Sequence, residues 1–80
     1  MERPLRYTYR IDLKTTDDVR EFTKIASGCE GRIYVTNGDK TLSAKSFLGV
    51  YLAKTSWNTL SVESDFDCFF DFRRFIVKNN

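Results

Sequence analysis

Eighty residues suffice for one small core, so residues 1–80 are expected to fold as a single domain. Thirteen lysines and arginines stand against eleven aspartates and glutamates, and the net charge of +2 is too small to indicate a nucleic-acid or lipid footprint. The chain contains no histidine, which excludes any mechanism that carries phosphate on an imidazole ring.

Two cysteines, Cys29 and Cys68, lack the spacing of metal ligands, and no apolar run follows the charged start of the sequence. The sequence therefore predicts a reduced cytoplasmic protein with no metal, no cofactor and no membrane segment. A disulfide between the two cysteines would require the fold to bring them together, and a reducing compartment argues against it.

The first predicted element is a β-strand over residues 5–13, where apolar and polar side chains alternate strictly. Because successive side chains of a strand point to opposite faces, this strand has one buried and one wet face. The buried face consists of Leu5, Tyr7, Tyr9, Ile11 and Leu13, and the wet face of Arg6, Thr8, Arg10 and Asp12.

An amphipathic helix is predicted next, starting near Thr16. Val19, Phe22 and Ile25 recur at steps of three, which places them on one face of the helix. A threonine or aspartate at the start can cap the first free amides. Gly28 is expected to close the helix in the left-handed conformation.

A β-hairpin follows this helix. Residues 32–36 form a strand with Ile33 and Val35 facing inward, and a tight turn at residues 37–39 leads into residues 40–43. Ser46 is then predicted to cap a short helix. That helix is too apolar for one face to bury all of its side chains, so some are expected to be exposed.

A fourth strand over residues 57–63 is expected to place Asn58, Leu60 and Val62 on one face. A last helix, capped by Ser64 or Asp65, carries the remaining phenylalanines as core residues. Its predicted apolar row consists of Phe66, Phe69 and Ile76, with Phe72 off that row and Lys78 at the negative end of the helix dipole. The alternative for Phe70 or Phe72, beside Arg73 and Arg74, is a dimer or partner surface.

The predicted order of elements is β-α-β-β-α-β-α, which defines the fold class as α+β. Helices that alternate with the strands of an antiparallel sheet pack on one of its faces, and the other face stays wet. The expected architecture is therefore an open-faced two-layer sandwich.

This order, together with residues 19–27, the Asn37-Gly38 turn and the segment AKSFLGV at residues 44–50, resembles the HPr family of the bacterial sugar phosphotransferase system. The resemblance covers roughly the whole chain in register. It implies an antiparallel sheet of four strands in the order 1-4-2-3, with three helices on one face. It also implies a protein related to the phosphoenolpyruvate-dependent phosphotransferase system.

In that family, a histidine at the start of the first helix takes phosphate from enzyme I, helped by a following arginine and proline. Aligning Ala26 and Ser27 without gaps places Thr15 at the histidine, Asp17 at the arginine and Asp18 at the proline. Two carboxylates beside an incoming phosphoryl group would repel it. The resemblance therefore implies a non-catalytic protein with a regulatory or protein-binding role.

Ser46 matches the regulatory serine that an HPr kinase modifies in many Gram-positive relatives. A histidine-free branch, the catabolite-repression HPr homologue, keeps this serine and acts in its phosphorylated form as corepressor with a transcriptional regulator, the catabolite control protein. Ser46 is thus a candidate phosphorylation site, where a phosphate would meet free amides at the positive end of the helix dipole. The alternative is a plain N-cap.

Phe47, Leu48 and Tyr51 match the apolar residues that the family exposes to protein partners. A contiguous exposed apolar patch usually marks an interaction site, whereas core packing is the alternative for these three side chains.

Single-strand nucleic-acid binding is a further alternative, because arginines and tyrosines are interleaved along the predicted strands. Tyr7 belongs to the inward face, however, while Arg6 and Arg10 face water, which favours an ordinary solvated face. The alternation therefore argues against nucleic acid as a partner. Catalysis has no support, because no nucleophile lies beside a base and no glycine-rich loop could hold phosphate.

Overall fold

The computed structural model describes residues 5 and 7–77 of the chain. The described residues form four strands and three helices in the predicted order. They are β1 (Tyr7–Ile11), α1 (Thr16–Ser27), β2 (Ile33–Thr36), β3 (Thr41–Ser43), α2 (Phe47–Ser56), β4 (Leu60–Ser64) and α3 (Phe69–Phe72).

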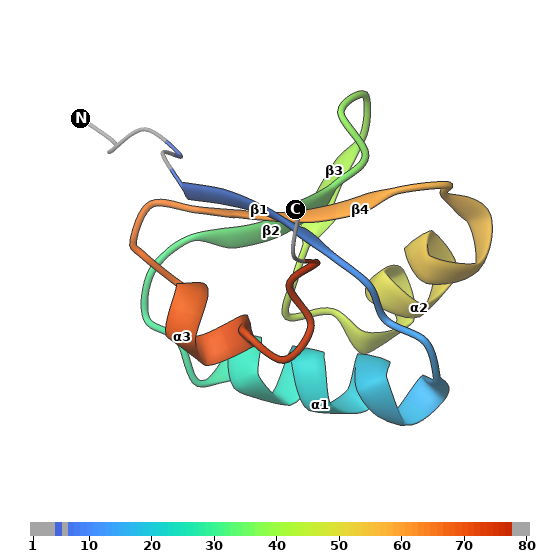
Figure 1. Cartoon of the computed structure of the whole chain (residues 1–80), viewed down its shortest axis with the longest axis horizontal. Coiled ribbons are helices and arrows are strands. Elements are labelled where there is room, and N and C mark those ends of the chain that lie inside the picture. Colours follow the sequence, from blue (N-terminus) through green and yellow to red (C-terminus); the bar gives the residue numbers. More distant parts are fainter. Residues whose placement is uncertain (1–4, 6, 78–80) are drawn as a thin grey trace.

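The four strands form one antiparallel sheet in the order β1-β4-β2-β3, which confirms the predicted order 1-4-2-3. Ser64 of β4 is paired with Tyr7 of β1 on one side and with Ile33 of β2 on the other. The three helices lie on one side of this sheet (Figure 1), so the fold is a two-layer α+β sandwich.

The core lies between the helices and the inner face of the sheet. Phe22 of α1 is fully buried, and its ring centroid lies 4.7 Å from that of Phe72 and 6.0 Å from that of Phe75. The sheet contributes Val35 and Val62 to this core, and neither side chain is exposed. Ile33 is buried as well, so the predicted inward orientation of Ile33 and Val35 on the first hairpin strand is confirmed.

The last helix differs most from its prediction. It spans only Phe69–Phe72, so neither Ser64 nor Asp65 caps it, and Ser64 is the final residue of β4. The chain leaves the helix because the sheet edge offers other partners: Ile76 forms a β-bridge with Ile11, and the amide of Val77 donates to the Arg10 carbonyl at 2.8 Å.

The predicted apolar row of that helix is also wrong. Phe72, expected off the row, is completely buried, and Phe75 is 4% exposed. Phe69, expected in the core, is 37% exposed, and Phe66 is only partly buried. A single helical turn followed by an extended segment has no common face, so helical spacing does not describe these side chains.

Smaller corrections concern element ends. Gly28 ends α1 with a φ of −83°, so it is not left-handed, and its amide donates to the carbonyls of Ile25 and Ala26. β4 begins at Leu60, which leaves Asn58 outside the strand and exposed. Arg6 of the predicted wet face and Lys78 lie outside the described residues.

Candidate functional site

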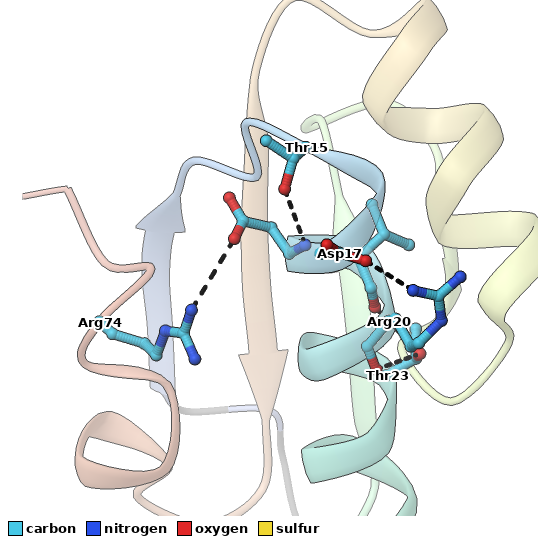
Figure 2. Close-up of polar contacts among 7 residues, drawn as sticks. Thr15, Asp17, Arg20, Thr23 and Arg74 are labelled. Atoms are coloured by element: carbon cyan, nitrogen blue, oxygen red, sulfur yellow. Dashed lines mark hydrogen bonds and ion pairs between the residues drawn. The ribbon is translucent and has the colours of Figure 1, made fainter.

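The start of α1, where the family resemblance places the phosphate acceptor, is capped by the chain itself. Thr15 precedes the helix with extended backbone, and its Oγ1 accepts a hydrogen bond from the Asp18 amide at 3.1 Å (Figure 2). Oδ2 of Asp18 accepts from the Lys14 amide at 2.9 Å. Thr15 is therefore an N-cap residue, and this is the role that its surroundings explain.

Both aspartates of this turn have cationic partners. Asp17 and Arg20 form an exposed ion pair of 2.6 Å, and Arg74 approaches Oδ1 of Asp18 at 3.8 Å (Figure 2). These pairs reduce the repulsion that two bare carboxylates would exert on a phosphoryl group. They also fill the turn with the chain's own charges, and no imidazole is present to accept phosphate.

The start of α2 is built differently. Ser46 is exposed, has extended backbone, and accepts a hydrogen bond from the Gly49 amide at 3.1 Å. The first turn of α2 contains no acidic residue, in contrast to Asp17 and Asp18 in α1. The predicted N-cap is confirmed, and the Ser46 hydroxyl is accessible.

The outward face of α2 is apolar. Phe47, Leu48 and Leu52 are 40%, 66% and 53% exposed, while Val50 and Ala53 on the inward face are buried. Tyr51 is partly buried, packs against the core and stacks on Phe47 with 6.2 Å between ring centroids. We define Phe47, Leu48, Tyr51 and Leu52 as the α2 patch. Three of its members were predicted as partner contacts, and helical spacing from Leu48 identifies Leu52 as the fourth.

A basic rim borders the α2 patch on the side of α1. Arg20, Lys24 and Lys45 line an open depression of about 460 Å³ together with Phe47. The Arg20 guanidinium carbon lies 6.0 Å from the centroid of the Phe47 ring, a cation–π distance. No regular spacing along the chain links these residues, because Arg20 and Lys24 lie on α1 whereas Lys45 lies in the turn before α2.

The wet face of the sheet has mixed chemistry. The register pairs Glu63 in the middle of the sheet with Thr8 on one side and Tyr34 on the other. Arg10 is exposed, whereas Arg32 lies 3.7 Å from the Asp65 carboxylate. A central carboxylate weakens the electrostatic attraction that single-strand nucleic acid would need.

Both cysteines are free thiols. Cys68 is fully buried and Cys29 partly buried, and burial is the main reason that the pKa of each thiol is raised. A raised pKa disfavours the thiolate, which is the reactive form.

Among residues 5 and 7–77, no group of three or more histidine, cysteine, aspartate or glutamate side chains is placed to hold a metal ion. In the same part of the chain, no helix has both the length and the apolar character needed to cross a membrane. Comparison of the chain with protein-family models, with curated proteins and with solved structures finds no match.

Proposed function

We propose that this chain is an HPr-like regulatory module that binds protein partners through the α2 patch and carries no phosphohistidine. The strand order and the three helices on one face agree with the fold that the resemblance implies. The absence of histidine and the self-capped start of α1 remove the acceptor chemistry of that family. A binding role is what this scaffold retains.

The observation that carries the proposal is the exposure of the α2 patch. Leu48 and Leu52 are more than half exposed on a helix whose opposite face supplies the core residues Val50 and Ala53. Apolar side chains gathered on one exposed face favour contact with another protein. Lys24 and Lys45 of the basic rim favour a partner with carboxylates around its own apolar contact, while Arg20 is paired with Asp17.

Binding is tested by titrating the isotope-labelled chain with purified catabolite control protein and, separately, with purified HPr kinase. We expect the amide signals of α2 to shift and the Phe47→Asp and Leu48→Asp variants to bind at least tenfold more weakly. Thr8→Asp is the matched control, because Thr8 is an exposed residue on the opposite face of the sheet. Equal binding by all variants, or no binding to either protein, contradicts the proposal.

A second candidate function, a switch by phosphorylation at Ser46, is favoured by the contrast between the two helix starts. The Ser46 hydroxyl is exposed, and the first turn of α2 has no carboxylate that would repel a phosphate. Lys45 adjoins it as a cation. A phosphate at this N-cap would accept hydrogen bonds from free amides, and its negative charge would interact favourably with the positive end of the helix dipole.

Incubation with an HPr kinase and ATP, followed by mass spectrometry, tests this switch. We expect one phosphate, lost in Ser46→Ala and retained in Ser43→Ala, since Ser43 lies three residues away at the end of β3. An unmodified chain, or modification that persists in Ser46→Ala, rules out Ser46 as the switch and leaves the binding role to its own test.

A further inference from the structure

The second exposed aromatic group lies on α3, away from the α2 patch. Phe70 is 75% exposed and Phe69 37% exposed. The two rings meet edge to face with 5.5 Å between centroids, and Tyr9 of β1 meets Phe69 in the same way at 5.6 Å. Three aromatic rings from two elements are thus in contact, and Tyr9, the partly buried one, also packs against the core.

Two carboxylates accompany these rings. Oδ1 of Asp67 accepts hydrogen bonds from the Tyr9 hydroxyl at 2.9 Å and from the Phe69 amide at 3.1 Å, which fixes its position. Asp71 is exposed and lies in α3, in the same turn as Phe69 and Phe70. Among the residues that the structure describes, no cation lies within ion-pair distance of either carboxylate.

The charges of Asp67 and Asp71 also act on the neighbouring Cys68 thiol. Burial raises the pKa of Cys68, and the charges of Asp67 and Asp71 act in the same direction. The α3 surface, which we define as Tyr9, Asp67, Phe69, Phe70 and Asp71, is therefore both aromatic and acidic.

We propose that the α3 surface binds an arginine-bearing segment of a partner protein. A guanidinium stacks on aromatic faces and pairs with carboxylates, so one side chain satisfies both features of the surface. This partner has the opposite charge to one that suits the basic rim beside α2. The two surfaces lie toward opposite ends of the helical layer (Figure 1), so each can be occupied independently.

Size argues against a second copy of the chain as the occupant. The exposed parts of Phe69 and Phe70 provide only about 200 Å² of aromatic area, because a complete phenylalanine side chain presents roughly 150–250 Å². A stable interface buries about 800 Å² on each partner. A short peptide segment anchored by one or two cations fits the α3 surface better.

The test uses the peptide Ac-GSRLRSG-amide and a matched peptide in which citrulline, a neutral isostere, replaces both arginines. Titration of the isotope-labelled full chain is expected to shift the amide signals of Tyr9 and of residues 67–71. Binding of the citrulline peptide is expected to be at least about tenfold weaker, and added salt weakens only the arginine peptide.

Two sets of variants locate the site. Asp67→Asn and Asp71→Asn remove charge but keep the side-chain shape. Asp67→Asn also keeps an acceptor oxygen for the Tyr9 hydroxyl and the Phe69 amide, so we expect folding to be preserved and arginine-peptide binding to fall. Phe70→Ala also weakens binding, whereas Leu48→Ala on the α2 patch leaves it unchanged. Equal binding of the two peptides, or shifts confined to other elements, overturns the proposal. Concentration-dependent dimerisation that Phe70→Ala abolishes also overturns it, because the occupant is then a second copy.

Discussion

The carboxylate of Asp18 at the start of α1 lies against the guanidinium of Arg74 in the C-terminal segment, with 3.8 Å between Oδ1 and Nη2 (Figure 2). Its other oxygen accepts the Lys14 amide. Asp18, which the resemblance aligns with the family's proline, and Thr15, aligned with its histidine, therefore both serve to cap the start of α1. The ion pair connects the start of α1 with the segment that follows α3.

The first prediction concerns phosphoryl transfer. Incubation with enzyme I and labelled phosphoenolpyruvate is expected to leave the chain unlabelled, because Thr15 caps the helix and no imidazole is present. A histidine-containing HPr, treated in parallel, serves as the positive control. Acid-labile phosphate on this chain would contradict our interpretation of the start of α1.

The second prediction concerns Gly31. A Cβ built there lies 2.5 Å from Cδ1 of Phe66 and 2.6 Å from Oδ1 of Asp65, so Gly31→Ala is expected to lower the free energy of unfolding by about 1–3 kcal/mol. At Gly28 a Cβ meets its nearest atom at 3.5 Å, with φ at −83°. Gly28→Ala should therefore leave stability unchanged or raise it by up to about 1 kcal/mol. Urea denaturation compares the two variants, and an equal effect would contradict the packing described for Gly31.

The third prediction separates the phenylalanines of the C-terminal region. Phe72→Ala removes a fully buried ring that packs on Phe22, and about 3–5 kcal/mol of stability should be lost. Phe70→Ala removes a mostly exposed ring and should change stability by less than about 0.5 kcal/mol. Thermal and urea unfolding measure both effects. A larger loss for Phe70→Ala than for Phe72→Ala would contradict the burial described for these two rings.

Local patterns predicted most of the fold. Strand alternation before Ile11 and helical spacing around Phe22 reflect which side chains a single element can bury, so they are visible in the sequence. The prediction for the last helix is wrong because two structures compete for residues 73–77: a longer helix, and pairing with the edge of β1. The edge of β1 binds Ile76 and Val77, and no helical pattern in residues 64–77 reports a strand edge formed at the start of the chain.

The candidate site was predictable to a similar extent. Ser46 at a helix start and apolar residues beyond it follow from sequence preferences for caps and faces. The basic rim, the Asp18–Arg74 pair and the α3 surface each join residues from separate elements. These groups form only when helices, strands and the C-terminal segment pack together, and the spacing of residues along the sequence does not report that packing.

The fourth prediction concerns the titration of Tyr9. Its hydrogen bond to Asp67 raises the pKa of the phenol above the ordinary value of 10.0, because ionisation would break this bond and place two negative charges together. The folded state therefore holds the proton more tightly than the unfolded state, and stability falls as pH rises above about 10. Asp67→Asn should lower the pKa of Tyr9, measured by tyrosinate absorbance. An unchanged titration would contradict the hydrogen bond.

Site-specific photo-cross-linking in cells of the native host shows whether partner proteins contact the α2 patch. A benzoylphenylalanine at position 48 samples the α2 patch, and one at position 34 samples the wet face of the sheet as a matched control. We predict a discrete protein adduct from position 48 that Phe47→Asp abolishes, and none from position 34. Adducts from position 34 alone, or the same adducts from both positions, would contradict the assignment of α2 as the contact surface.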